Sequence, residues 1–182
     1  MDKHKFQGKY RIESTRLKDY NYSRNGAYFV TICTKNSMQL FGSIVDQKLI
    51  PNRQAEVVTE CWLDLPAHYT NCVLDKFIIM PNHVHGIIIM DNEIVETGLK
   101  PVSTAGRVAK SYSLSEIIRG FKTFSARKIN EYQNTRGKAF WQSRFFDHII
   151  RNREELKRIR QYIIENPLKW ELEKNNHENL FM

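Results

Sequence analysis

Two histidines, His83 and His85, lie one residue apart in MPNHVHGIIIM, a segment that otherwise consists of apolar, strand-forming residues. Side chains alternate between the two faces of a β-strand, so both imidazole rings should point to the same side. Two imidazoles placed in this way can bind one divalent metal ion. The alternative is that both rings pack as ordinary core or edge histidines, and an isolated His-x-His pair favours that alternative.

A second group of candidate residues lies near the end of the sequence, in YIIENP. Tyr162 and Asn166 are four residues apart, so on a helix they lie one above the other on one face. They flank an apolar stripe by which the helix would dock on a sheet, formed by Leu156, Ile159 and Ile163. A tyrosine beside such a stripe is usually a core residue with an exposed hydroxyl, and asparagine is a common helix end. Both roles therefore stay open at this point.

The segments around these residues predict an α+β fold. Strands are expected at residues 27–34, 73–80, 83–90 and 139–151, with a short hairpin formed by LFGSIV and QKLIP. Helical periodicity predicts helices at 52–69, ending near Pro66, at 113–132, and from Asn152 to a stop at Pro167. This order matches a ferredoxin-like antiparallel sheet (βαββαβ) with an extra C-terminal helix that carries Tyr162.

Turn and cap residues mark the ends of these elements. Pro81-Asn82 separates two apolar runs and predicts a tight hairpin, so that the histidines begin the second strand. Ser113 or Ser115 is expected to cap the second helix, and Asn152 and Glu155 have capping-box spacing at the start of the last one. The segment between the second hairpin strand and the second helix has no stable period and predicts a loop.

The chain has 182 residues and fits one domain, with a polar N-terminal arm at 1–26 and a C-terminal tail at 171–182. Its 28 Lys and Arg against 20 Asp and Glu give a net charge of +8, which favours an acidic polymer such as nucleic acid as partner. No apolar run could span a membrane, and the start lacks the apolar core of a secretory signal, so a cytoplasmic protein without a membrane partner is expected.

The three cysteines, Cys33, Cys61 and Cys72, are odd in number and form no C-x-x-C pair. This pattern argues against a disulfide framework and against a cysteine zinc site, so buried thiols are expected.

Three motifs together resemble a known family: His-hydrophobic-His within MPNHVHGIII, then WQSRFFDHIIR, then YIIENP. In this order they resemble the HUH single-tyrosine transposases, specifically the REP-associated tyrosine transposases, over most of the chain. The resemblance implies a ferredoxin-like fold in which His83 and His85 ligate Mg²⁺ or Mn²⁺. It also implies that Asn166 supplies a third ligand through its amide oxygen and that Tyr162 is the nucleophile.

Two parts of the resemblance are weaker. Related insertion-sequence transposases often carry glutamine at the position of Asn166. Asp147 and His148 belong to the family pattern, but their roles do not follow from the sequence, because a strand would point them to opposite faces.

The reaction implied by the resemblance is attack by Tyr162 on a single-stranded DNA phosphodiester. It would give a 5′-phosphotyrosine bond and a free 3′-hydroxyl, followed by strand transfer or rejoining. A phenol with a reference pKa of about 10 is a poor nucleophile at neutral pH, and a divalent metal would polarise the attacked phosphate. The resemblance implies a substrate with a hairpin, as in repetitive extragenic palindromes (REP), and it allows a homodimer.

Basic residues among aromatic ones are expected to contact this DNA, and about half of them should do so. They are Arg107, Lys110, Arg119, Lys122, Arg127, Lys128, Arg144 and Arg151. Cations follow phosphates, while Phe121 or Tyr112 could stack on unpaired bases. Two rival functions stay open: a metal-dependent hydrolase that activates water, and a nucleic-acid-binding module without catalysis.

Overall fold

The fold is a four-stranded antiparallel sheet with helices on both faces. The structure, a computed structural model, describes residues 5–6, 9–10, 20–93 and 111–175. The sheet has the strand order β6-β7-β3-β8. Its strands are β3 (Gly26–Cys33), β6 (Cys72–Met80), β7 (His83–Met90) and β8 (Phe146–Ile150). This order and the alternation of strands with helices confirm the ferredoxin-like α+β fold expected from the sequence.

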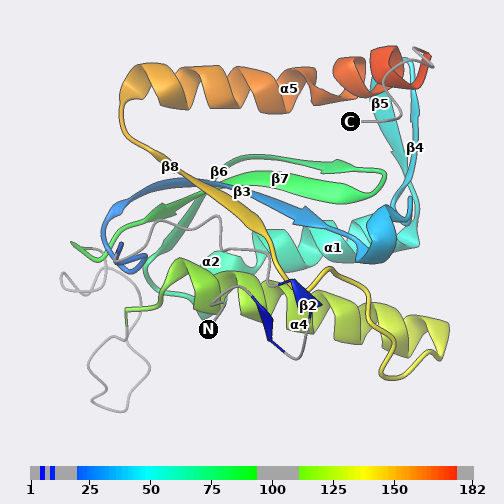
Figure 1. Cartoon of the computed structure of the whole chain (residues 1–182), viewed down its shortest axis with the longest axis horizontal. Helices are drawn as coiled ribbons and strands as arrows, with labels where there is room; N and C mark the ends of the chain where they lie inside the picture. Colours follow the sequence, from blue (N-terminus) through cyan, green and yellow to red (C-terminus); the bar gives the residue numbers. More distant parts are fainter. Residues whose placement is uncertain (1–4, 7–8, 11–19, 94–110, 176–182) are drawn as a thin grey trace.

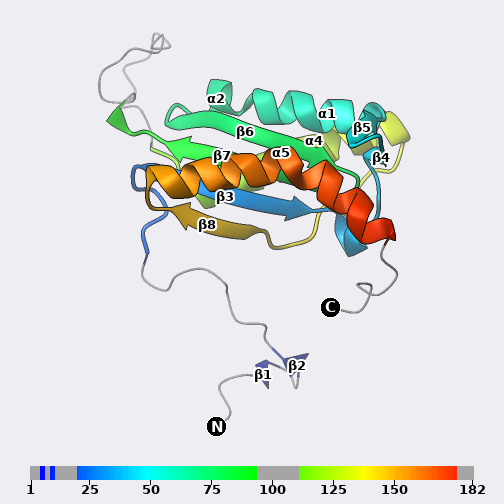
Figure 2. The same cartoon turned by 90° about the horizontal axis from the view of Figure 1, so that it is seen from above.

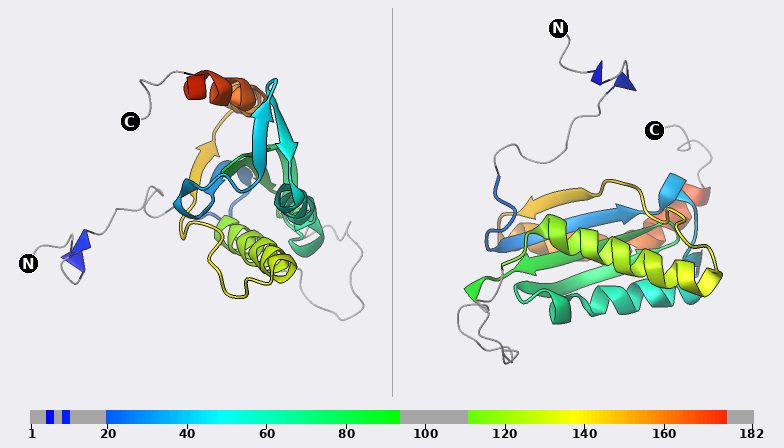
Figure 3. Two further views of the ribbon diagram at one scale, coloured as in Figure 1. Left: turned by 90° about the vertical axis from the view of Figure 1, so that its right-hand side faces the viewer. Right: turned by 90° about the horizontal axis from the view of Figure 1, so that it is seen from below.

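The helices divide between the two faces of the sheet (Figure 1, Figure 3). One face is covered by α1 (Arg53–Leu63), α2 (Leu65–His68) and α4 (Leu114–Gln133). The other face is crossed by α5 (Arg153–Asn175). Smaller elements are a hairpin of β4 (Gly42–Val45) and β5 (Lys48–Pro51), a 3-10 turn at Lys35–Ser37, and the strands β1 (Lys5–Phe6) and β2 (Lys9–Tyr10).

Alternation along the central strand β3 separates two cores. Tyr28, Val30 and Ile32 point into the larger core, between the sheet and the helices α1 and α4. Phe29 points the other way, into a small core under α5. Because Phe29 lies opposite Ile87 in the β3–β7 ladder, His85 and His83 share the α5 face with Ile87. The strand periodicity therefore places both histidines beneath the helix that carries Tyr162.

The hairpin that begins with the histidines forms as the sequence predicts. Met80 pairs with His83 across the Pro81-Asn82 turn. The carbonyl of Asn82 accepts hydrogen bonds from both the backbone N–H and the hydroxyl of Thr34, at 2.9 and 3.0 Å. Those two bonds attach the turn to the end of β3. The start of β7 is therefore held both by its pairing with β6 and by Thr34.

The predicted end of the last helix is wrong. α5 continues through Pro167 to Asn175, and Figure 2 shows it changing direction between its orange and red parts. Proline removes one helical hydrogen bond and usually kinks the helix. Contacts made by the residues beyond it hold the continuation: Trp170 lies against His83, and Lys169 forms an ion pair with Glu165 at 3.5 Å. Packing therefore overrides the local preference of the residue before proline.

Two other element boundaries differ from the prediction. The expected helix at 52–69 is two helices, because α1 ends at Leu63 and Pro66 lies in the first turn of α2. Proline suits a first turn, where its missing N–H has no partner to lose. Within 139–151 only Phe146–Ile150 is a strand, while Trp141 makes a single bridge to Thr34.

Helix caps largely follow the sequence. Ser113 and Glu116 form a complete capping box at α4. At α5, Asn152 accepts from the backbone N–H of Glu155 at 2.8 Å, which is half of the expected box. The carboxylate of Glu155 turns instead to the backbone N–H of Arg151 and to His148. The predicted loop before α4 falls mostly on residues outside the described ranges.

Gly86 lies next to His85, at a point where helix α1 presses on the sheet. A Cβ atom at Gly86 would lie 2.3 Å from a ring carbon of the fully buried Trp62. We expect Gly86→Ala to lower the free energy of unfolding by about 1–3 kcal/mol, the usual cost of overpacking. Urea unfolding measures it.

The control is the same substitution in a Trp62→Phe background. The smaller ring lacks the two carbons nearest to the added methyl group, so the cost of Gly86→Ala should fall there. An equal cost in both backgrounds would mean that contact with Trp62 is not the cause.

Candidate active site

His83 and His85 form a closely spaced pair at the start of β7. Their ring centroids are 4.4 Å apart, and the ring of Phe29 stacks on His85 at 5.2 Å. Burial lowers the pKa of His83 to about 4 and, together with the neighbouring His83, that of His85 to about 3. Both rings are therefore neutral at physiological pH, the form in which imidazole binds metals.

Hydrogen bonds orient both rings through their Nδ1 atoms. His83 Nδ1 lies 2.6 Å from the side-chain oxygen of Asn82, whose amide nitrogen donates to the carbonyl of Ser37. The Asn82 oxygen must then accept, which puts the proton of His83 on Nδ1 and leaves the lone pair on Nε2. His85 Nδ1 lies 2.8 Å from the hydroxyl of Thr31, its partner in the β3–β7 ladder.

Tyr162 lies directly over His85, on the first half of α5. Its hydroxyl is 3.5 Å from His85 Nε2, and its ring meets that of Phe29 edge-on at 6.0 Å. The buried side chain of Ile163 docks the helix in the small core. Tyr162 itself is 38% exposed, so a molecule in solution can reach it.

Asn166 lies one turn further along α5 and is buried, with 7% of its surface exposed. Its side chain makes a polar contact with the His83 ring, which partly opposes the lowering of the pKa of His83. Nε2 of His83 is nevertheless buried and lacks a hydrogen bond of normal geometry to the described residues. A buried nitrogen with a free lone pair is an atom that a ligand would satisfy.

These side chains fit a divalent metal ion. Within the described ranges, no group of three or more His, Cys, Asp or Glu side chains is placed to hold one. Two neutral imidazoles and an amide oxygen are a different donor set, and here His83, His85 and Asn166 provide it on one side of the sheet. The structure thus brings the four sequence-predicted site residues together, Tyr162 included, while their roles stay predictions.

Comparison with known proteins gives the family. Residues 106–166 match the model of the family described as "Transposase IS200 like". An uncharacterized protein of Haemophilus influenzae (strain Rd) is 36% identical over 165 residues, which are 87% of this chain and 89% of that protein. The chain belongs to the IS200-like transposase family. The matched segment contains Tyr162 and Asn166 but begins after strand β7, so His83 and His85 lie outside it.

A solved structure gives the fold. The structure of a REP-associated tyrosine transposase bound to a REP hairpin is similar to this transposase with a TM-score of 0.58 and 18% identity. The match covers 87% of this chain and 74% of that chain. The identification made from the three sequence motifs is therefore confirmed, the family by the family model and the fold by the solved structure. No helix in the described ranges is long and apolar enough to cross a membrane.

Several residues at the site of the transposase were missed in the sequence. The ring of Trp170 lies 5.9 Å from that of His83, and the Lys169 ammonium group lies 4.9 Å from the centre of the Tyr162 ring. Both follow Pro167, where the helix was expected to end. Thr31 could have been found, because antiparallel pairing of the two predicted strands sets it opposite His85.

Four of the predicted DNA-binding cations lie away from this site. Arg119, Lys122, Arg127 and Lys128 belong to α4, on the opposite face of the sheet. Lys122 donates to the carbonyls of Gln142 and Ser143, at 2.5 and 3.0 Å, and so holds the loop before β8. Arg144 lies in that loop and Arg151 follows β8, while Arg107 and Lys110 lie outside the described residues.

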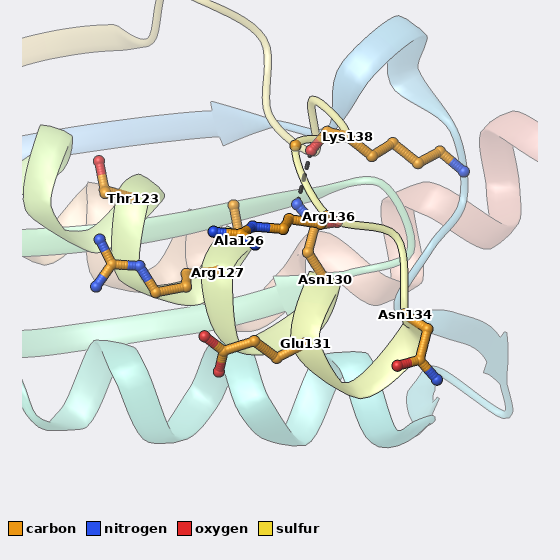
Figure 4. Close-up of a pocket in the computed structure, with 9 residues that line it drawn as sticks. Thr123, Ala126, Arg127, Asn130, Glu131, Asn134, Arg136 and Lys138 are labelled. Carbon is orange, nitrogen blue, oxygen red and sulfur yellow. Dashed lines mark hydrogen bonds between the residues drawn. The ribbon is translucent and has the colours of Figure 1, made fainter.

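A groove with basic residues runs along the C-terminal half of α4 (Figure 4). Arg127, Arg136 and Lys138 line it, together with uncharged Asn130 and Asn134 and one acidic residue, Glu131. The amide of Asn130 donates to the carbonyl of Lys138 at 2.9 Å and fixes the loop over the helix. Sequence reasoning named only Arg127 here, since the loop cations are adjacent to the helix only in the folded chain.

Proposed function

We propose that this transposase cleaves and rejoins single-stranded DNA by metal-dependent transesterification, with Tyr162 as the nucleophile. The observation that carries the proposal is the hydroxyl of Tyr162, 3.5 Å from Nε2 of a buried, neutral histidine pair. A tyrosine with a purely structural role would not require its hydroxyl to lie beside two neutral imidazoles. Membership of the transposase family supports DNA as the substrate.

His83, His85 and Asn166 would hold Mg²⁺ or Mn²⁺. When bound, the ion would polarise the scissile phosphate and so compensate for the weak nucleophilicity of a phenol. The chain supplies what the ion needs: neutral rings, Nδ1 atoms that are already hydrogen-bonded, and a site shielded from water on one side by Phe29.

The side chains of the protein account for the other requirements of the step. α5 holds the Tyr162 oxygen so that it can attack phosphorus in line with the leaving 3′ oxygen. The bond from phosphorus to the tyrosine oxygen forms as the bond from phosphorus to the 3′ oxygen breaks. The phenol loses its proton, and the 3′ oxygen gains one and leaves as a hydroxyl. Because the linkage to tyrosine is again a phosphodiester, a 3′-hydroxyl can reverse the step without ATP.

The substrate we propose is single-stranded DNA next to a hairpin. A protein of the same fold is described as bound to a REP hairpin, and the net charge of +8 favours nucleic acid. The cations of α4 and the basic groove face away from Tyr162. DNA that contacts both regions must therefore pass around an edge of the sheet, where Arg144 and Arg151 flank the edge strand β8.

End-labelled hairpin oligonucleotides with Mn²⁺ or Mg²⁺ test the proposal. A 5′-phosphotyrosine link keeps the downstream fragment on the protein, so a 3′ label should migrate with the protein on a denaturing gel. A 5′ label should instead appear on a shorter free fragment. Chelation by EDTA should abolish both products.

The two rival functions give different gels. A hydrolase that activates water would cut the strand and leave both labels free of protein. A binding module would leave the oligonucleotide intact. Either outcome would refute the proposal.

Thr31 should affect the metal through His85. Its hydroxyl lies 2.8 Å from His85 Nδ1, and outer hydrogen bonds of this kind typically change metal affinity by about 10–100-fold. We expect Thr31→Val, which keeps the shape of the side chain, to weaken Mn²⁺ binding by that factor in calorimetric titration. Thr123→Val on α4 is the control, because within the described residues that hydroxyl bonds inside its own helix, to the carbonyl of Arg119. Equal affinity in the Thr31 variant and the wild type would contradict the prediction.

A further inference from the structure

An Asp–Arg ion pair and a histidine–carboxylate hydrogen bond join α5 to the two edge strands of the sheet that it crosses. Arg160 of α5 forms a two-pronged pair with Asp75 of β6, in which Nε lies 2.9 Å from Oδ1. Glu155 of α5 accepts from His148 of β8, at 2.8 Å from Nε2. The strands β6 and β8 lie at opposite edges of the sheet (Figure 2). Both attachments precede Tyr162 by less than two turns of helix.

The pair at β6 is built into an irregularity of that strand. Asp75 lies where the β6–β7 register shifts, between Leu74 and Phe77. Leu74 packs against the larger core, so the alternation of side chains along the strand places Asp75 on the α5 side. The Asp75 side chain is 11% exposed, and its hydrogen bond with Arg160 lowers the pKa of its carboxyl group. The ionised form is thus the one that the fold stabilises, and a planar guanidinium fixes direction as well as distance.

The pair at β8 includes the backbone. The Glu155 carboxylate accepts from the backbone N–H of Arg151 at 2.7 Å and from His148. Both hydrogen bonds lower the pKa of Glu155, and the one from Arg151 has the larger effect. Its side chain is 18% exposed. One side chain therefore joins the end of β8 to the first turn of α5, and it uses the histidine of the FFDHII motif to do so.

The apolar contact under α5 has few fully buried members, which are Phe29, Ile87, Ile150 and Ile163. Partly buried side chains surround them: Ala27, Ile78, Ile89, Leu156 and Ile159. Apolar packing of this kind resists separation but resists rotation of a helix about its axis only weakly, since the hydrophobic effect has no fixed direction. Side-chain tips lie about 6 Å from a helix axis, so a turn of about 20° would move the Tyr162 hydroxyl by about 2 Å.

We infer that the Asp75–Arg160 and His148–Glu155 pairs position Tyr162 for attack by fixing the rotation and height of α5 over the histidine pair. The inference rests on the proposed function, and it gives His148 a role that its sequence motif alone did not. These four are positioning residues, because they act on the reaction through Tyr162.

The test is a pair of full-length variants. In Asp75→Asn/Arg160→Gln both partners are neutral, so no unpaired charge is left behind. His148→Ala removes the other attachment. Adduct formation at saturating DNA should slow by about 10–100-fold in each, the usual effect of a misplacement near 1 Å. The DNA concentration for half-maximal rate should stay within about twofold of the wild type, because the DNA contacts are unchanged.

Control variants and a measurement that does not depend on activity separate loss of the attachments from a general effect of substitution on α5. Arg158→Gln changes an exposed arginine of the same helix and should leave the rate unchanged. Asp75→Arg/Arg160→Asp exchanges the charges and should restore part of the rate. Amide hydrogen exchange across α5 should accelerate in both pair-breaking variants and not in Arg158→Gln.

The possible failures are distinct. Unchanged exchange in both variants overturns the inference, whether or not the wild type forms an adduct. An unchanged adduct rate, or a loss confined to DNA affinity, overturns it as well. If the wild type forms no adduct while the variants alter exchange, the pairs do hold α5 and the proposed function is what has failed.

Discussion

Replacing Tyr162 by phenylalanine should abolish protein-linked DNA, with a loss of more than about 10³-fold in the rate of adduct formation, because no other group can take the place of a covalent nucleophile. The substitution removes one oxygen, which lies 3.5 Å from His85 Nε2 on the partly exposed side of the helix, so the fold should be unaffected. The measurement is the 3′-labelled hairpin assay, with thermal unfolding run in parallel.

Tyr132→Phe is the matched control for this variant. Tyr132 is 62% exposed on α4, on the opposite face of the sheet, and its loss should leave adduct formation intact. If Tyr162→Phe forms the adduct as well as the wild type does, the assignment of the nucleophile is wrong. If cleavage continues but the adduct disappears, water is the nucleophile and the hydrolase function replaces the one proposed.

The second large effect is expected at the histidine pair. We expect His83→Gln and His85→Gln each to abolish metal-dependent adduct formation and to weaken Mn²⁺ binding by at least about 100-fold. Each loses one of three proposed ligands, and glutamine offers a weaker donor at a different distance. Because both rings are neutral in the fold, with pKa values of about 4 and 3, glutamine replaces them without adding or removing charge at neutral pH.

Thermal unfolding measures this effect without DNA. A ligand at 100 times its dissociation constant stabilises the folded protein by about 2.7 kcal/mol, so Mn²⁺ should raise the melting temperature of the wild type. The rise should vanish in both histidine variants. His68→Gln is the control, since His68 is exposed on α2 and pairs with Asp64. A full rise in His83→Gln or His85→Gln would remove that residue from the proposed ligand set.

The sequence predicted the strand that carries the histidines and the helix that carries Tyr162, for local reasons. Alternation along β7 and the Pro81-Asn82 turn are properties of adjacent residues, and so is the apolar stripe of α5. The continuation past Pro167 was not predicted, because it depends on Trp170 reaching His83, and that residue is 87 positions away in the chain. Pairing between distant strands decided which side chains surround the site.

The sequence did not predict how the cations divide between the two faces of the sheet, for a similar reason. Helical spacing shows that Arg119 and Arg127 lie on the same helix, but not which face of the sheet that helix covers. The polar partners of the site were equally hidden. Asp75 becomes a partner of Arg160 only when the folded chain brings α5 across β6, and the two residues are 85 positions apart in the sequence.

In this structure Tyr162 and the histidines that it approaches belong to one chain, so the geometry needs no second copy to bring them together. A homodimer stays a prediction from the family resemblance. Mixing Tyr162→Phe with His83→Gln would report on it, since restored adduct formation requires exchange of α5 between chains.

The central strand β3 has a further consequence, for the time at which the site becomes complete during synthesis. Thr31, on β3, emerges from the ribosome first, His83 and His85 follow, and Tyr162 and Trp170 come last. At about 5–20 residues per second, the 85 positions from His85 to Trp170 take roughly 4–17 seconds. Until Tyr162 has been made, the nascent chain holds the histidine pair without the proposed nucleophile, so under the proposed function it does not attack DNA before its own fold is nearly finished.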